Sequence, residues 1–151
     1  KKCHVSLREV FREKYSRQTY LCVVDILSKD RDSAQSIFLE LLRSTNREEI
    51  YWGSVLAGSI GETALPEIHR LLDSNDWKVR CNGLVAIERI QSELSLPYLL
   101  ELLEDEYMTI RKLAVKCLGI IAVPKAKDYL IKLVNSGDTE MRLSVLEALE
   151  I

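Results

Sequence analysis

Residues 77–87 read WKVRCNGLVAI, residues 108–118 read MTIRKLAVKCL, and residues 139–149 read TEMRLSVLEAL. Each stretch has an apolar residue followed by Arg at its third and fourth positions, and a small residue followed by a large apolar one at its end. The step between stretches is 31 residues. A period of this length is typical of helical solenoids, whose units stack side by side, rather than of a single closed core.

The residues before each of these stretches predict a first helix in every unit. Residues 65–72 (LPEIHRLL) place apolar side chains at helical spacing, and Pro66 falls in the first turn, where its missing amide donor costs little. Residues 73–76 (DSND) then predict a polar turn in which Asp76 accepts an amide hydrogen bond at the start of the second helix. Neither helix can bury its apolar stripe alone, so the units must stack.

The pattern weakens toward the N-terminus. We expect helices over residues 18–28, 34–43 and 48–60, a capped turn over Asp30–Ser33, and Gly61 as a helix C-cap. The predicted organisation is one domain over 1–151 with about five helix pairs. It comprises an irregular pair (1–31), a degenerate repeat (32–61) and regular repeats at 62–93, 94–124 and 125–151, the last truncated.

The motif L-P-x-I/L-x-x-L-L, followed by a short acidic turn, V/I/M-R, and A-I or C-L, resembles the HEAT repeat. More narrowly, it is similar to the short bacterial type related to phycobilin lyases, and the resemblance covers residues 62–151. It implies an all-α fold, a right-handed α-α superhelix with first helices on the convex side and second helices on the concave side. In that family, the Asp and Arg of the turn form a ladder between adjacent units.

Carried onto this sequence, the resemblance predicts a structural ladder of arginines and turn carboxylates. Its members are Arg80, Arg111 and Arg142 with Asp76, Asp105 and Asp138. Tyr107 occupies the position of the acidic cap in the middle repeat, which leaves Asp105 as the nearest substitute. A guanidinium fork matches a carboxylate. The alternative is a row of arginines that binds anions.

The sequence offers little for catalysis or for metal binding. None of its cysteines (Cys3, Cys22, Cys81 and Cys117) has C-x-x-C spacing, and neither His4 nor His69 is followed by Glu. The His-Glu pairs of the HEAT-like iron hydroxylases are therefore missing. No Gly-rich phosphate loop or triad appears. We expect no cofactor and no metal, a buried Cys117, an exposed Cys81 and, from the unpaired thiols, a cytoplasmic location.

Charge argues against a nucleic-acid partner. The chain has 21 basic and 23 acidic residues, and the presumed concave columns hold only one small basic spot, Lys112 with Lys116. Residues 1–20 are basic. They suit a solvated helix face. The alternative is a contact with nucleic acid or with a membrane, the latter beside an anchor in a longer parent protein. No apolar run is long enough to span a membrane.

The remaining signal is aromatic. Tyr98 and Tyr129 share a column on the first helices, and Trp77 and Met108 share one at the start of the second helices. Such residues are enriched in binding hot spots, whereas Trp52 is expected to pack internally. With Lys112 and Lys116, these four form the candidate protein-binding set. We therefore expect a non-enzymatic scaffold that binds a protein or peptide along the concave face; the alternative is a helper in tetrapyrrole or bilin attachment.

Overall fold

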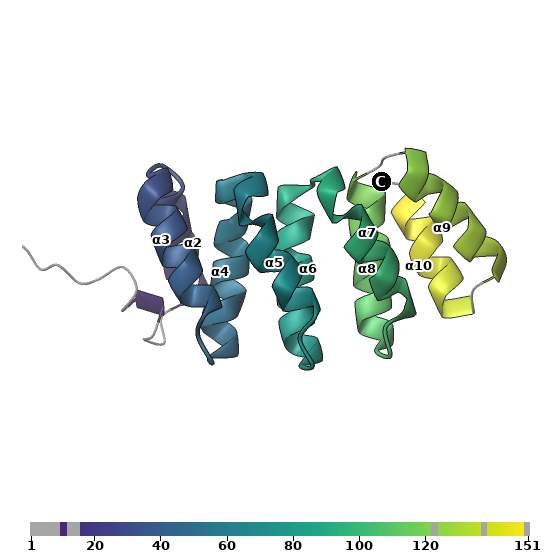
Figure 1. Cartoon of the computed structure of the whole chain (residues 1–151), viewed down its shortest axis with the longest axis horizontal. Coiled ribbons are helices and arrows are strands. Elements are labelled where there is room, and N and C mark those ends of the chain that lie inside the picture. The colour runs from purple at the N-terminus through teal and green to yellow at the C-terminus, as the bar shows by residue number, and fades with distance from the viewer. Residues whose placement is uncertain (1–9, 12–15, 122–123, 137–138, 150–151) are drawn as a thin grey trace, which may run out of the picture.

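The computed structural model describes residues 10–11, 16–121, 124–136 and 139–149, and in these ranges it contains helices and turns but no strand. Figure 1 shows the helices standing side by side in a row along the long axis of the molecule. They are α2 (Arg17–Leu27), α3 (Arg31–Leu42), α4 (Arg47–Ile60), α5 (Leu65–Leu72), α6 (Trp77–Ile90), α7 (Leu96–Glu101), α8 (Met108–Ile121), α9 (Pro124–Ser136) and α10 (Thr139–Leu149).

The helices pair as the repeat predicts. α3 packs with α4, α5 with α6, α7 with α8 and α9 with α10, while α4, α6, α8 and α10 contact one another in succession. The prediction of an all-α repeat solenoid is thus confirmed. Short 3-10 segments, η1 (Gly61–Ala64), η2 (Glu93–Ser95) and η3 (Leu102–Glu104), adjoin the first helices α5 and α7.

One predicted turn is wrong. The segment Asp30–Ser33 was expected to be a turn, but α3 already begins at Arg31. The reason is that Asp30 caps the helix, accepting hydrogen bonds from both the amide and the hydroxyl of Ser33. The first helix expected in the N-terminal pair falls largely on residues outside the described ranges.

Columns of equivalent residues form the core. Ile68, Leu99 and Leu130, one from each regular repeat, are 0%, 0% and 2% exposed. Cys117 is also buried, as predicted, and so are its repeat equivalents Ala86 and Ala148. Burial raises the pKa of the Cys117 thiol to about 12, so it stays protonated and acts as a small apolar group. Cys81, in contrast, was expected to be exposed but is half-buried, because it packs against the core from α6.

The degenerate repeat packs against the N-terminal part of the chain through aromatic rings. Trp52 of α4 is 4% exposed, as expected for a packing residue. Its ring lies 4.7 Å from Tyr20 of α2, 5.1 Å from Tyr51 and 6.5 Å from Phe11. These contacts bury the side of α4 that faces the N-terminal helix.

Two helix ends follow the predicted local chemistry. Gly61 caps α4 with a φ of 79°, a conformation that is strained for any residue with a side chain. Asp76 caps α6, its carboxylate accepting the Lys78 amide at 3.0 Å. In the following repeat Tyr107 precedes α8, and Asp105 accepts the Tyr107 amide at 2.9 Å in the turn before the helix.

We expect Leu99→Ala to lower the free energy of unfolding by about 2–5 kcal/mol, because it leaves a cavity in the centre of the stack. Leu94→Ala removes the same atoms from a side chain that is 62% exposed, and should cost less than about 0.5 kcal/mol. Guanidinium denaturation followed by circular dichroism compares the two. Equal midpoints would show that the column of Leu99 is not the core.

Candidate protein-binding surface

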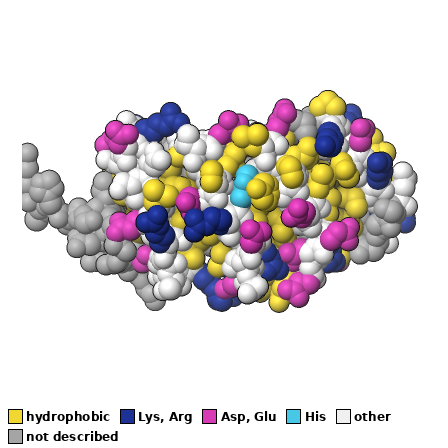
Figure 2. Space-filling model, in the orientation of Figure 1, with side chains coloured by type: hydrophobic (Ala, Val, Ile, Leu, Met, Phe, Trp, Pro, Cys, Tyr) yellow, Lys and Arg dark blue, Asp and Glu magenta, His cyan; other side chains and the backbone are white. Residues whose placement is uncertain are grey.

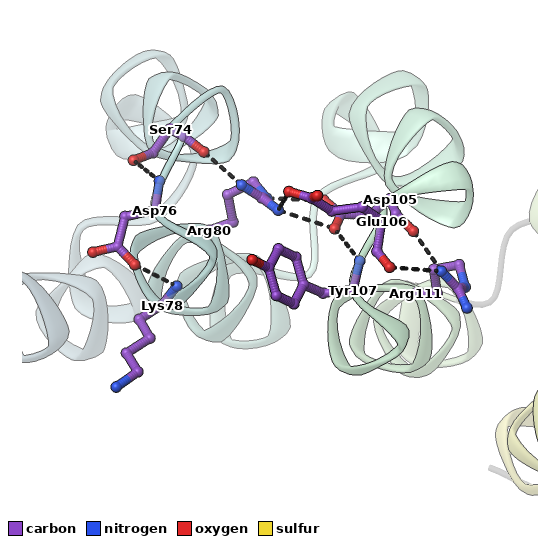
Figure 3. A network of polar contacts seen from close by, with 8 residues as sticks. All are labelled: Ser74, Asp76, Lys78, Arg80, Asp105, Glu106, Tyr107 and Arg111. Atoms are coloured by element: carbon purple, nitrogen blue, oxygen red, sulfur yellow. Dashed lines mark hydrogen bonds and ion pairs between the residues drawn. The ribbon is translucent and has the colours of Figure 1, made fainter.

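The turns before the second helices carry a row of ion pairs. Arg80 of α6 reaches the next unit, where its Nε lies 2.8 Å from Asp105 Oδ2 and its Nη2 lies 3.0 Å from Asp105 Oδ1 (Figure 3). Its Nη1 donates to the carbonyl oxygen of Ser74 at 2.7 Å, within its own unit. The side chains of Arg80 and Asp105 are only 9% and 7% exposed. The hydrogen bond to Asp105 raises the pKa of Arg80 above its usual 12.5, so the guanidinium stays charged.

A second pair of the same kind precedes this one. Arg47, the first residue of α4, contacts Asp76 Oδ2 through Nη2 at 2.6 Å and through Nε at 2.7 Å. The Lys78 amide, with a further contribution from Arg47, holds the pKa of Asp76 below its usual 3.8. Sequence reasoning missed Arg47 because the repeat alignment places Ile50 opposite Arg80. An Arg one helical turn earlier was the available signal.

Arg111 is the repeat equivalent of Arg80, but among the described residues its hydrogen bonds stay within its own unit. Arg111 donates through Nη1 to the carbonyl oxygens of Asp105 and Glu106, at 2.6 and 3.3 Å, and so closes the turn of its own unit (Figure 3). Asp138, the remaining carboxylate of the predicted ladder, lies outside the described residues. Arg142 is exposed on α10. We propose that the pairs Arg47–Asp76 and Arg80–Asp105 are the rungs of a structural ladder between units.

Two of the candidate binding residues lie at this turn edge. Trp77 and Met108 are both half-buried. The Trp77 ring stacks on Tyr107 at 5.5 Å, and the guanidinium of Arg80 lies 5.6 Å from the Tyr107 ring. Tyr107 therefore lies between Arg80 on one side and the ring of Trp77 on the other, which gives Trp77 a packing role. Binding by Trp77 and Met108 stays a prediction.

Two further candidates lie on the first helices, away from the second-helix columns. Tyr98 of α7 stacks on His69 of α5, with ring centroids 3.8 Å apart, and His69 Nε2 lies 3.2 Å from the hydroxyl of the buried Ser95. Tyr129 of α9 is 38% exposed, and Lys132 lies over its ring at 5.4 Å. Figure 2 shows hydrophobic side chains gathered over the part of this face where α5, α7 and α9 lie.

The two lysines of the predicted basic spot lie together, but each is paired with a glutamate. Lys116 of α8 pairs with Glu88 of α6 at 2.8 Å, and Lys112 of α8 pairs with Glu140 of α10. These ion pairs therefore connect three successive second helices. Because each lysine has a carboxylate partner, the spot offers little net positive charge to a ligand.

A depression of about 450 Å³ lies between α8 and α10. Its lining consists of Lys112, Leu113, Lys116, Glu140, Leu143, Ser144, Glu147 and Ala148. Leu143 is 57% exposed there, although it is a large apolar residue. Sequence reasoning did not select it. The available signal was its repeat column, which has Cys81 and Lys112 in the preceding repeats and a large apolar residue only in the last one.

The same helical face carries a second depression of about 610 Å³ between α4, α6 and α8, lined by Tyr51, Val85, Glu88, Arg89, Gln91 and Ile120. Both depressions are thus formed by second helices. Of the six candidate residues, Lys112 and Lys116 are brought together, in the depression between α8 and α10. The other four, Trp77, Met108, Tyr98 and Tyr129, line neither depression.

In the described ranges, no group of three or more His, Cys, Asp or Glu side chains is arranged to hold a metal ion. Within the same ranges, every helix is too short or too polar to span a lipid bilayer.

Comparison with known proteins gives a family and a fold. A family model described as HEAT repeats matches residues 65–150. No curated protein sequence matches the chain. Among solved structures, the chain is similar to a designed armadillo repeat protein in complex with the peptide (KR)4, with a TM-score of 0.57, 18% identity and coverage of 95% of this chain and 79% of that one. A second match is to computationally designed armadillo repeat proteins for modular peptide recognition, with a TM-score of 0.54, 19% identity and coverage of 96% and 81%.

Arg80→Ala should lower the free energy of unfolding by about 3–5 kcal/mol, because it leaves the Asp105 carboxylate nearly buried without its guanidinium. Arg111→Ala should also lower the melting temperature, through the loss of its hydrogen bonds to the turn. Lys112→Ala, which removes an exposed ion pair, should cost no more than about 1 kcal/mol. Thermal unfolding of the three variants decides the matter: equal melting temperatures would exclude the ladder.

His69 should make the stability depend on pH. Burial lowers the pKa of His69 below its usual 6.5, and Asp73 opposes this effect only in part. The folded protein therefore binds a proton less readily than the unfolded chain. The stability contributed by neutral His69 is complete above about pH 6.5 and falls as the pH drops through that value toward the folded-state pKa.

We expect wild type to lose more stability between about pH 7.5 and 5.5 than His69→Leu, since Leu is the residue at the equivalent position 100. Melting temperatures of both proteins across this range test the expectation. Parallel curves would show that His69 carries no linked proton.

Proposed function

The chain belongs to the HEAT repeat family, and on that premise we propose that it is a non-enzymatic scaffold that binds a protein or peptide along the face formed by α4, α6, α8 and α10. The observation that carries this proposal is the depression between α8 and α10, in which Leu143 is 57% exposed. A large apolar side chain exposed inside a concavity is the usual anchor point of a binding surface.

The charges around Leu143 favour an apolar anchor in the ligand. Lys112 pairs with Glu140 and Lys116 pairs with Glu88, so both lysines of the depression are already compensated. A strongly acidic ligand would have to displace these carboxylates. An apolar side chain placed on Leu113 and Leu143 would bury surface without breaking an ion pair, while the paired charges form a polar rim.

The likeness to designed armadillo proteins supports a peptide partner by analogy of fold. Those proteins are described as made for modular peptide recognition, and one is seen with the peptide (KR)4. At 18% and 19% identity, however, the likeness concerns the fold alone. The proposal for this chain therefore rests on its own surface.

The narrower resemblance to phycobilin lyases carries the alternative function, a helper in tetrapyrrole or bilin attachment. Addition of a bilin followed by visible absorbance separates the two. A saturable spectral shift would favour the alternative.

A cytoplasmic location and a membrane contact through the basic residues 1–20 also stay predictions, and most of that segment lies outside the described residues.

The scaffold function can be tested by panning a displayed peptide library on the immobilised chain. We expect peptides with a large apolar residue to be enriched, and Leu143→Glu to weaken their binding by about tenfold or more, since a charge replaces the apolar anchor. Leu94→Glu makes the same change at a side chain 62% exposed outside both depressions, and should leave binding unchanged.

Calorimetry on the selected peptides measures the effect. Failure to enrich any peptide, or equal loss of binding in the two variants, would contradict a binding site in this depression.

A further inference from the structure

We infer that the depression between α4, α6 and α8 is a second subsite for the peptide and that Arg89 binds an acidic side chain of the peptide there. This inference rests on the proposed function, since it names a further requirement of the same ligand. The peptide that fits both depressions has an apolar residue over Leu143 and an aspartate or glutamate over Arg89.

Arg89 differs from the other basic residues of the two depressions because it has no carboxylate partner. The basic side chains that line the depressions are Arg89, Lys112 and Lys116. The two lysines are paired with glutamates of α10 and α6. Arg89 is exposed, and within the described part of the chain its guanidinium forms no ion pair. Because Glu88 in the same depression is already held by Lys116, this depression keeps a positive charge for a ligand.

The stem of the Arg89 side chain lies against the neighbouring helix. Gly58 of α4 has no side chain, and a Cβ atom there would lie 2.8 Å from Cβ of Arg89 and 3.6 Å from its Cγ and Cδ. The backbone of α4 therefore approaches the stem closely and restricts its rotamers. A side chain that is already restricted loses less conformational entropy when it pairs with a ligand.

The rest of the lining suits the methylene groups of an acidic residue. Tyr51, Val85 and Ile120 are half-buried and contribute apolar surface from three successive second helices. A glutamate that pairs with Arg89 can place its stem on this surface, where the ion pair is partly shielded from water and therefore stronger than in bulk solvent. None of the lining residues belongs to α9 or α10, so the last helix pair does not shape this subsite.

The two depressions are adjacent, which sets the spacing in the ligand. Glu88 lines one and Lys116 lines the other, and their ion pair of 2.8 Å lies at the boundary. Packed helices stand about 8–10 Å apart and an extended chain advances about 3.3 Å per residue, so the acidic residue lies about four or five positions from the apolar anchor. A peptide that runs along the stack passes over α6 in mid-chain, which favours a side chain over a terminal carboxylate.

The test starts from the displayed peptide library panned on the intact chain. Enriched peptides should carry Asp or Glu about four or five positions from the apolar residue more often than the starting library does. One such peptide is synthesised with an amidated C-terminus, both as selected and with its acid replaced by the amide. Calorimetry then measures the affinity of both peptides for wild type and for Arg89→Gln. Loss of the charge on either side should weaken binding about threefold to fivefold, and loss of both should weaken it no further.

Arg43→Gln is the matched control. Arg43 is also exposed and forms no ion pair within the described residues, but it lines neither depression, so its substitution should leave the affinity unchanged. Arg89→Glu should bind a peptide with Lys in place of the acid more tightly than the selected peptide, a reversal that a loss of folding would not produce. Melting temperatures within a few degrees of wild type establish that the variants are folded.

The outcomes separate this inference from the proposed function. Peptides that lose affinity with Leu143→Glu but not with Arg89→Gln would overturn the acidic subsite alone. The same holds if Arg89→Gln weakens the acid and amide forms of the peptide equally. Affinity lost on amidation of the C-terminus, with the acidic side chain dispensable, would make a terminal carboxylate the ligand and also overturn the inference. Failure to enrich any peptide would overturn both proposals.

Discussion

No helix pair in this protein can bury its apolar stripe without the neighbouring pair. Ile68, Leu99 and Leu130 are all buried, and successive units contact one another through their second helices. The stability of each unit therefore depends on its interfaces as much as on its own two helices, as expected for a one-dimensional stack. The exposed surface is left with few constraints, and that freedom is what a binding scaffold requires.

Polar contacts between units add geometric specificity to this apolar stack. The Arg80–Asp105 pair is nearly buried and combines a hydrogen bond from Nη2 with an ion-pair contact from Nε, and the same guanidinium donates to the Ser74 carbonyl of its own turn. Because the fork of an arginine is planar and its partners are fixed, the contact accepts only a narrow range of orientations between adjacent units. The exposed pairs Lys112–Glu140 and Lys116–Glu88 repeat the connection between second helices, with less effect on stability.

One surface departs from the polar exterior expected of such a stack. Leu143, a large apolar side chain that is 57% exposed, lies in the depression between α8 and α10. The lysines beside it are paired with carboxylates of α6 and α10, so the apolar side chain is the feature that a ligand can use there.

The sequence by itself determined the repeat, the helical class and the buried columns, because a period of 31 residues and helical apolar spacing are local properties that survive in any solenoid arrangement. It also predicted the caps at Asp76 and Gly61, which depend on neighbouring residues only. The partners of the turn carboxylates were decided by tertiary structure. Arg47 reaches Asp76 across 29 residues, a distance that no local pattern encodes.

The same reason explains the binding surface. Lys112 and Lys116 were identified from the sequence, but their neutralisation by Glu140 and Glu88 depends on how far apart α6, α8 and α10 stand in the stack. The exposure of Leu143 likewise depends on a depression between two helices, and the stacking of His69 on Tyr98 on the spacing of α5 and α7. Sequence periodicity says which residues face inward, whereas the packing of adjacent units decides which outward residues meet.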